Sequence, residues 1–246
     1  MTSYSPEQIV VSCEHGGRQV PADYAALFAA AGALLDSHRA WDPGSAELAE
    51  ALAATLEVAP VIGRITRLLV DLNRSPGHPR RFSTLTRRLP PAAQAALAAE
   101  HYLPHRQQVE RLVRRAVAAK GRALHISVHT FTPELDGKLR QADVALLYDP
   151  RRARELSLCR RWAAQLARAC PDLRVRRNYP YKGVSDGLTT FLRTRFPDAE
   201  YQGVELEVNQ RWPEGPEGEW RNLIATVARV TRDVLMGRAD GGAAPA

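Results

Sequence analysis

Three short segments of the chain carry side chains that bind carboxylates or metals. The apolar run 68–72 leads directly into Asn73 and Arg74, and two other apolar runs end at His15 and His129. Arginine offers a planar fork that binds a carboxylate through two hydrogen bonds, and a neighbouring Asn adds uncharged donors. The first segment therefore predicts a clamp for a substrate carboxylate, although a strand followed by an ion-paired turn would give the same pattern.

The two histidines need a partner if they hold a catalytic metal. Zinc in such sites generally has three protein ligands and one open position, and neutral imidazoles on rigid strands suit it. Glu14 is adjacent to His15, but neighbouring side chains on an extended strand point to opposite faces. Asp42, just before Pro43 and Gly44, is therefore the preferred third ligand, with an N-cap or turn role as the alternative. Of the other histidines, one is expected in the core, His125, and four in solvent: His38, His78, His101 and His105.

The segment 203–210 alternates acidic with apolar residues. A period of two places Glu205, Glu207 and Asn209 on one face of a strand. A solvated sheet face would look the same, but a central strand of an α/β sheet is normally apolar on both faces. The acids therefore favour the edge of a site, where a carboxylate beside a metal acts as general base and then as general acid. Glu207 is the predicted base.

Short β-rich runs alternate with longer helical patterns, which is typical of an α/β sheet with crossover helices. Ligand sites in such folds lie at the carboxyl edge of the sheet, and loops that follow strands carry Arg81, Tyr181 and Lys182. The expected strands are residues 9–13, 59–62, 68–72, 124–129, 144–148, 174–177 and 204–208. The expected helices are residues 45–56, 106–119, 151–169 and 220–235.

The composition is that of an ordinary globular protein. The 246 residues are 45% hydrophobic and 25% charged, which permits a full core. We expect one domain over residues 1–236 and a flexible, Gly- and Ala-rich tail over residues 237–246. No apolar run approaches the length of a membrane span, and the N-terminus lacks a secretory signal, so the sequence predicts a cytoplasmic protein.

The net charge of +7 does not by itself indicate a nucleic-acid partner. Nearly all of it comes from dispersed arginines, and no basic tract is interleaved with aromatic residues. An anionic small substrate is compatible with this excess. The three cysteines are an odd number without metal-type spacing, so neither a disulfide framework nor a Cys-based zinc site is indicated.

Five motifs, in this order, resemble the N-formylglutamate amidohydrolase family. They are Cys13-Glu14-His15-Gly16-Gly17, Trp41-Asp42-Pro43-Gly44, Asp71-Leu72-Asn73-Arg74, His129-Thr130-Phe131-Thr132-Pro133 and Glu207-Val208-Asn209-Gln210. The fold and site of that family are similar to those of zinc carboxypeptidases and of the aspartoacylase and succinylglutamate desuccinylase group. The resemblance implies a three-layer α/β fold, zinc carboxypeptidase-like, with a mixed, mostly parallel sheet flanked by helices.

The resemblance also implies a metal-ligand set. His15 and His129 correspond to metal-binding histidines. Carboxypeptidase-like enzymes take another ligand from the Glu of a His-x-x-Glu motif, but Arg18 stands at that place here. An acid further along serves within the family, and Asp42 matches it.

Substrate and catalytic roles follow from the same resemblance. Asn73 and Arg74 correspond to the pair that holds the substrate carboxylate, Arg67 to an arginine that polarises the scissile carbonyl, and Glu207 to the base. Asp71 is expected at least to orient one of the two arginines. Loop position and charge, rather than the resemblance, predict that a side-chain carboxylate is reached by Arg81, Tyr181 and Lys182.

The implied activity is that of a zinc-dependent amidohydrolase that cleaves the amide of an N-acyl amino acid, such as N-formyl-L-glutamate to L-glutamate and formate. Another divalent metal is an alternative to zinc. The expected partner is a small anionic substrate, without nucleic acid or membrane, and the expected state is a monomer or small homo-oligomer. Two other functions stay open: a related zinc hydrolase for another N-acyl amino acid or short peptide, and a non-catalytic binding protein for acidic metabolites.

Overall fold

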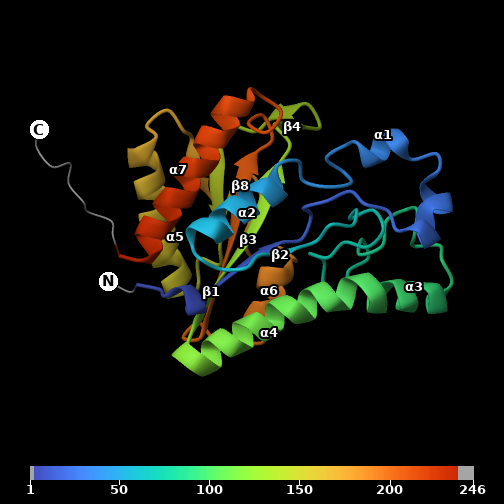
Figure 1. The fold of residues 1–246 in the computed structure, drawn as a ribbon, viewed down its shortest axis with the longest axis horizontal. Helices are drawn as coiled ribbons and strands as arrows, with labels where there is room; N and C mark the ends of the chain where they lie inside the picture. The colour runs from blue at the N-terminus through green and yellow to red at the C-terminus, as the bar shows by residue number, and fades with distance from the viewer. Residues whose placement is uncertain (1–2, 238–246) are drawn as a thin grey trace, which may run out of the picture.

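A six-stranded sheet with helices on both faces lies at the centre of the molecule (Figure 1). The computed structural model describes residues 3–237. Its strands are β1 Ile9–Cys13, β2 Val61–Ile62, β3 Ala123–Phe131, β4 Glu134–Leu135, β5 Lys138–Leu139, β6 Val144–Leu147, β7 Val175–Arg177 and β8 Tyr201–Asn209. Its α-helices are α1 Gly32–Leu35, α2 Ser45–Thr55, α3 Pro91–Leu97, α4 Leu103–Lys120, α5 Ala153–Ala169, α6 Leu188–Arg193 and α7 Glu217–Leu235. Short 3-10 helices span Pro6–Gln8 and Ala22–Phe28, and a π-helical turn spans Ala98–Tyr102.

The sheet is mixed and has the strand order β2-β1-β3-β8-β6-β7. β2, β1, β3 and β8 run parallel, whereas β6 pairs antiparallel with β8 and parallel with β7. β4 and β5 form a separate two-stranded hairpin. The predicted fold class, an α/β fold with a mixed, mostly parallel sheet flanked by helices, is confirmed.

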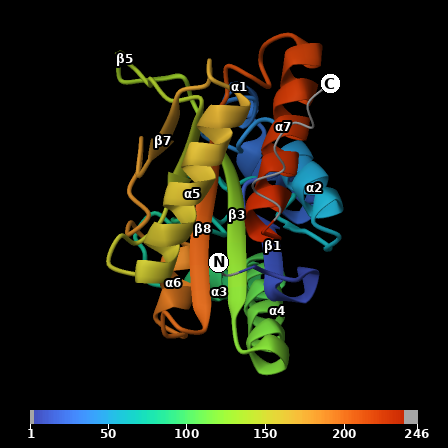
Figure 2. The ribbon, with the colours of Figure 1, turned by 90° about the vertical axis from the view of Figure 1, so that its left-hand side faces the viewer.

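One face of the sheet is apolar and carries the main core. Alternate residues of the central strands, including Val11, Ile126 and Leu206, point to this face and are fully buried. Helices α2, α5 and α7 cover it, and Figure 2 shows α5 and α7 in front of β8 and β3. Leu48 and Leu52 of α2 recur at helical spacing and pack into this core, which explains why the segment forms a helix.

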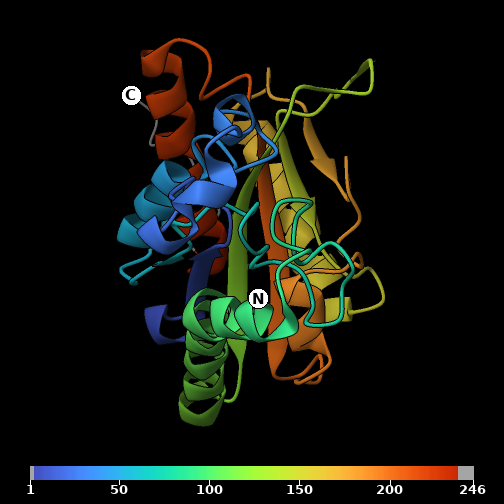
Figure 3. The ribbon, with the colours of Figure 1, turned by 90° about the vertical axis from the view of Figure 1, so that its right-hand side faces the viewer.

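The opposite face is polar toward the carboxyl ends of the strands. The register pairs Ser12 with Ser127, Ser127 with Glu205, and His129 with Glu207 across β1, β3 and β8. The other half of this face packs on apolar side chains of α4 and α6, two helices that Figure 3 shows beside the sheet. Hydroxyls, imidazoles and carboxyls therefore form rows on a buried sheet surface, where each needs a hydrogen-bond partner.

Most predicted elements are present with shifted ends. The predicted strand at residues 59–62 shortens to the two residues of β2. Helices α1, α3 and α6 were not predicted, since they are short or follow prolines. The correctly predicted strands are β1, β3, β6, β7 and β8, and the correctly predicted helices are α2, α4, α5 and α7.

The predicted strand at residues 68–72 is wrong. This segment forms turns in the long irregular stretch between β2 and α3, and its apolar side chains join a separate cluster with Phe82 and Tyr102. Its backbone is bonded to another loop, as in the hydrogen bond from Asp71 N to Arg81 O at 2.8 Å. The predicted carboxylate clamp therefore lies on a long buried loop, a type of segment that often carries function.

Among the described residues, no helix combines the length and the apolar character that a bilayer crossing requires. The predicted flexible tail, residues 237–246, lies outside the described residues apart from Gly237.

Candidate active site

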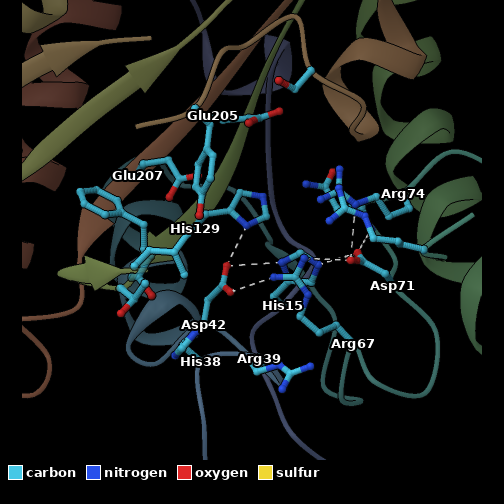
Figure 4. Close-up of a pocket in the computed structure, with 18 of the residues that line it drawn as sticks. His15, His38, Arg39, Asp42, Arg67, Asp71, Arg74, His129, Glu205 and Glu207 are labelled. Atoms are coloured by element: carbon cyan, nitrogen blue, oxygen red, sulfur yellow. Dashed lines mark hydrogen bonds and ion pairs between the residues drawn. The ribbon is translucent and has the colours of Figure 1, made fainter. Parts of the chain in front are cut away.

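A cavity of about 600 Å³ opens at the carboxyl ends of the parallel strands. Its walls come from the loop after β1, from β3 and β8, and from the long loop between β2 and α3 (Figure 4). This is the sheet edge at which α/β folds place ligands. The predicted site residues that line it are His15, Asp42, Arg67, Asn73, Arg74, His129, Tyr181, Lys182 and Glu207.

Arg81 differs from its predicted position. Its guanidinium lies over the rings of Phe82 and Tyr102, at 4.7 and 5.4 Å from the ring centroids, and Arg80 lines the cavity instead. The chain turns here, with Arg81 N donating to His78 O at 3.0 Å. Position in the sequence could not show which of two adjacent arginines in a turn faces inward.

His15, Asp42 and His129 converge on one buried point. Asp42 Oδ2 lies 2.9 Å from His129 Nδ1 and 3.4 Å from His15 Nδ1, and dashed lines in Figure 4 join Asp42 to both rings. One candidate ligand atom from each residue lies within 4.8 Å of the others. His15 Nδ1 is buried without a hydrogen-bond partner among the described residues, which is costly unless a ligand binds it. Two imidazole nitrogens and one carboxylate oxygen fit a divalent metal such as zinc.

The Nε2 atom of each histidine, on the side of the ring away from Asp42, contacts a further carboxylate. Asp71 Oδ1 lies 2.7 Å from His15 Nε2, and Glu14 Oε2 lies 3.1 Å from His129 Nε2. Such a carboxylate accepts a hydrogen bond from Nε2–H, which keeps the proton on Nε2 and leaves the lone pair of Nδ1 for a metal. Glu14, which was the alternative third ligand in the sequence, therefore contacts the far side of the His129 ring and orients that ring.

Glu14 is the centre of a buried polar cluster. Ser12 and Ser127 each donate to one of its oxygens at 2.5 Å, and His105 Nε2 lies 3.5 Å away. Burial alone would raise the pKa of Glu14, but hydrogen bonds from His105 and His129 hold that pKa well below its usual range. The prediction that His105 is solvated is wrong, because α4 packs its first turns onto the polar half of the sheet.

We expect Glu14→Gln to weaken metal binding without removing it. The amide cannot accept hydrogen bonds from both serines and from His129 at once, so the imidazole loses its fixed tautomer, and such losses typically cost about 10–100-fold in metal affinity. Competition titration of zinc against a chromophoric chelator measures the change. Glu50→Gln is the matched control, since Glu50 pairs with Arg64 on the surface; equal affinities in the two variants would remove Glu14 from this role.

Glu205 and Glu207 form an acidic wall of the cavity on β8. Both are buried, and Glu207 stands beside His129 in the sheet register. Glu207 Oε2 has no hydrogen-bond partner among residues 3–237. Burial raises the pKa of Glu207 to about 8 and also raises the pKa of Glu205. A positive charge bound nearby lowers such a pKa, so Glu207 is suited to exchange a proton near neutral pH.

Two arginines reach the cavity from the long loop. Arg67 donates to Asp71 at 2.8 Å and lies 3.5 Å from Asp42, so its guanidinium is anchored beside the candidate metal ligands. Arg74 donates to Asp186 O at 2.9 Å. Each leaves part of its guanidinium open to the cavity, where a carboxylate or carbonyl oxygen can bind.

The neighbours of Arg74 fix the geometry of the clamp. Asn73 Oδ1 accepts the backbone N–H of Leu188 at 2.7 Å, which leaves its amide nitrogen as a donor. Tyr102 and Arg106 donate to the carbonyl of Arg74 at 2.7 and 3.3 Å. The sequence pattern gave no sign of this support, because its residues lie far away along the chain.

Comparisons with known proteins identify the family of the chain. The family model described as N-formylglutamate amidohydrolase matches residues 7–212, a span that contains all of the residues above. Among solved structures, gene product Atu2144 from Agrobacterium tumefaciens is 27% identical with a TM-score of 0.78, over 95% of this chain and 92% of that one. The N-formylglutamate amidohydrolase from Ralstonia eutropha JMP134 is 17% identical with a TM-score of 0.68, over 97% of both chains, and shares the fold. No curated protein sequence matches significantly. The chain belongs to the N-formylglutamate amidohydrolase family.

Proposed function

We propose that this protein is a metal-dependent amidohydrolase that cleaves the amide of an N-acyl amino acid, with N-formyl-L-glutamate as the reference substrate. The observation that carries the proposal is the convergence of His15, Asp42 and His129 beside the unpartnered oxygen of Glu207. Membership of an amidohydrolase family supports the reaction class, and the donor set supports zinc.

In this proposal each residue of the site has a separate role in hydrolysis. His15, Asp42 and His129 would hold a divalent metal, which when bound would supply positive charge near the acyl carbonyl and would make water a stronger acid. Glu207 Oε2 accepts a proton from the attacking water and then returns it to the leaving nitrogen. Arg67 donates to the acyl oxygen as negative charge develops there, and its bond to Asp71 keeps it in place for that step.

The clamp of Asn73 and Arg74 binds the carboxylate of the amino-acid part. Arg74 contributes charge-assisted hydrogen bonds, and the free amide nitrogen of Asn73 adds a neutral donor. Binding at this point fixes the distance from the carboxylate to the scissile amide. Tyr181 and Lys182, which line the cavity, complete the substrate-binding set in this proposal.

Arg74→Ala should raise KM and leave kcat nearly unchanged, because the clamp holds ground state and transition state alike. Hydrogen bonds to a charged group contribute about 1.5–3 kcal/mol, which corresponds to roughly 10–100-fold in KM. Steady-state kinetics with N-formyl-L-glutamate measure this. The control substrate carries an α-amide in place of the α-carboxylate, and the control variant is Arg151→Ala, since Arg151 pairs with Asp149 at the surface. An unchanged KM in Arg74→Ala would move the clamp elsewhere.

A screen of N-formyl, N-acetyl and N-succinyl amino acids with zinc-, cobalt- or manganese-loaded protein tests the proposed function. Release of a free amine from any of them, abolished by chelator, supports an N-acyl amino acid amidohydrolase. Binding of acidic metabolites without hydrolysis of any member would favour the non-catalytic alternative.

A further inference from the structure

Two of the apolar residues that line the cavity, Phe131 and Leu135, have no role in the function proposed above. Phe131 ends β3 and is buried, and Leu135 lies on β4 and is 38% exposed. The cavity volume of about 600 Å³ falls within the range of roughly 300–1,000 Å³ that is found for pockets of drug-sized ligands. Apolar residues in the walls of such pockets contact the apolar parts of the ligand.

The ring of Tyr181 belongs to the same wall as Phe131. The guanidinium of Arg140 faces both rings, with its central carbon 5.9 Å from the centroid of Phe131 and 4.9 Å from that of Tyr181. Arg140 Nη1 also donates to the hydroxyl of Tyr181 at 2.9 Å. Arg140 itself does not line the cavity, so a ligand meets the two rings and not the charge that joins them.

The two sequence neighbours of Phe131 offer no free hydroxyl proton to a ligand. Thr130 Oγ1 donates to the backbone carbonyl of Pro43 at 2.8 Å. Thr132 Oγ1 donates to the backbone carbonyl of Glu134 at 2.9 Å. This end of the cavity is therefore suited to an apolar group.

The pairing of β3 with β8 orders the polar face of the sheet into three rows at the site. Residues on one face of a strand recur at every second position, so successive rows are roughly 6–7 Å apart. In order toward the carboxyl ends, the paired residues are Ser127 with Glu205, His129 with Glu207, and Phe131 with Asn209. Phe131 therefore lies one row beyond the candidate metal ligand on the same strand.

The carboxylate clamp lies beside the first row. A Cβ placed on Gly187 would lie 3.2 Å from Glu205 Oε1 and 3.1 Å from Asn73 Oδ1, so one point on the backbone is close to both side chains. The second row holds a candidate metal ligand and the proposed base, where the scissile amide must lie. A substrate that is held by the clamp therefore directs its acyl substituent toward the third row.

Three further cations line the cavity, and they belong to loops on the clamp side. They are Arg39, Arg80 and Lys182. Arg39 precedes the residue whose carbonyl accepts the backbone N–H of Arg67, and Arg80 lies in the loop that follows Arg74. The loop of Lys182 accepts a hydrogen bond from Arg74 Nη1 at 2.9 Å. These cations are available to a side-chain carboxylate of the amino-acid part, as in glutamate.

We propose that Phe131, Leu135 and Tyr181 form an acyl subsite, and that the preferred substrates are N-acyl amino acids whose acyl group carries an apolar chain. The inference rests on the proposed function and narrows the acyl part of its substrate class. The third row lies roughly 6–7 Å beyond the row of the scissile amide. A formyl group has only a hydrogen atom on that side, so N-formyl-L-glutamate binds and leaves the acyl subsite empty.

The test uses L-glutamate derivatives that differ only in the acyl group: acetyl, butanoyl and hexanoyl. With zinc-loaded wild-type protein, kcat/KM should rise along this series, by about tenfold or more from acetyl to hexanoyl. Each fully buried methylene contributes roughly fourfold, and this wall is partly open to solvent. Isothermal titration of zinc-loaded Glu207→Gln protein, in which turnover is slow, should show tighter binding in the same order.

A variant of the hairpin assigns the effect to the acyl subsite. Leu135→Asp should lower the ratio of kcat/KM for hexanoyl to that for acetyl by about threefold or more, because it removes apolar surface from the wall. Leu139→Asp is the matched control, since Leu139 lies on the other strand of the hairpin, is 69% exposed and does not line the cavity. It should keep the wild-type ratio.

The two proposals fail in different ways. Binding of the hexanoyl derivative no tighter than that of the acetyl derivative, or an unaltered ratio in Leu135→Asp, overturns the acyl subsite even if N-formyl-L-glutamate is hydrolysed rapidly. Tighter binding of N-succinyl- than of N-pentanoyl-L-glutamate also overturns it, because the acyl end then recognises charge. Hydrolysis of no derivative, with the order of binding intact, overturns the proposed function and leaves the subsite standing. The wild-type kinetic series decides the question even if a variant does not fold.

Discussion

Glu207→Gln is expected to reduce kcat by about a hundredfold or more while zinc still binds stoichiometrically. The substitution preserves the shape of a buried side chain but removes the group that accepts and returns the proton, and loss of a general base typically costs 10²–10⁴-fold. Rapid-quench or steady-state kinetics, with zinc measured by elemental analysis, separate the chemical defect from metal loss.

The control for this experiment is the metal affinity. Glu207 is not among the three residues whose ligand atoms converge, so the variant should titrate with zinc as the wild type does. Turnover within a few-fold of wild type would show that another group transfers the proton. Loss of zinc together with activity would instead make Glu207 a ligand and change the proposed arrangement.

His129→Ala is expected to abolish stoichiometric zinc binding and, with it, hydrolysis. The change removes one of three ligands and also the imidazole that contacts Asp42. Elemental analysis of protein after dialysis against trace zinc gives the occupancy directly. Full occupancy in this variant would place the metal elsewhere.

His38→Ala is the matched control for His129→Ala. His38 also lines the cavity, and Figure 4 shows it below Asp42, but it is not part of the convergent group. Its removal should leave zinc content near the wild-type value. A loss of zinc comparable to that in His129→Ala would mean that the ligand set is larger than three residues.

The site residues that could be predicted from the sequence are those that lie on a regular strand of the sheet. In β8 the period-two alternation shows at once that Glu205 and Glu207 share a face, and in β3 the apolar run ends near His129 because the strand ends there. Local geometry of this kind depends on residues that are close together in the sequence, so the sequence pattern predicts it.

The strand prediction was wrong for an apolar segment that is buried in a loop. Residues 68–72 are as apolar as a sheet strand, but their partners are Phe82 and Tyr102 in a loop cluster, and an apolar run does not reveal which of these two environments surrounds it. The same holds for Glu14. Its partners His105 and Ser127 lie about a hundred residues away, and this long-range contact has no local signature.

Because one face of the sheet is apolar and the other is polar, the two faces affect the register in which β8 pairs during folding. A slip of one residue would turn Glu205 and Glu207 toward the apolar helices and Val204 and Leu206 toward the cavity. Burying two acids among α2, α5 and α7 costs several kcal/mol, so misaligned pairings are rejected. Glu205 and Glu207 therefore also help to fix the register of β8. Leucine at either position would remove this preference, and glutamine would retain it.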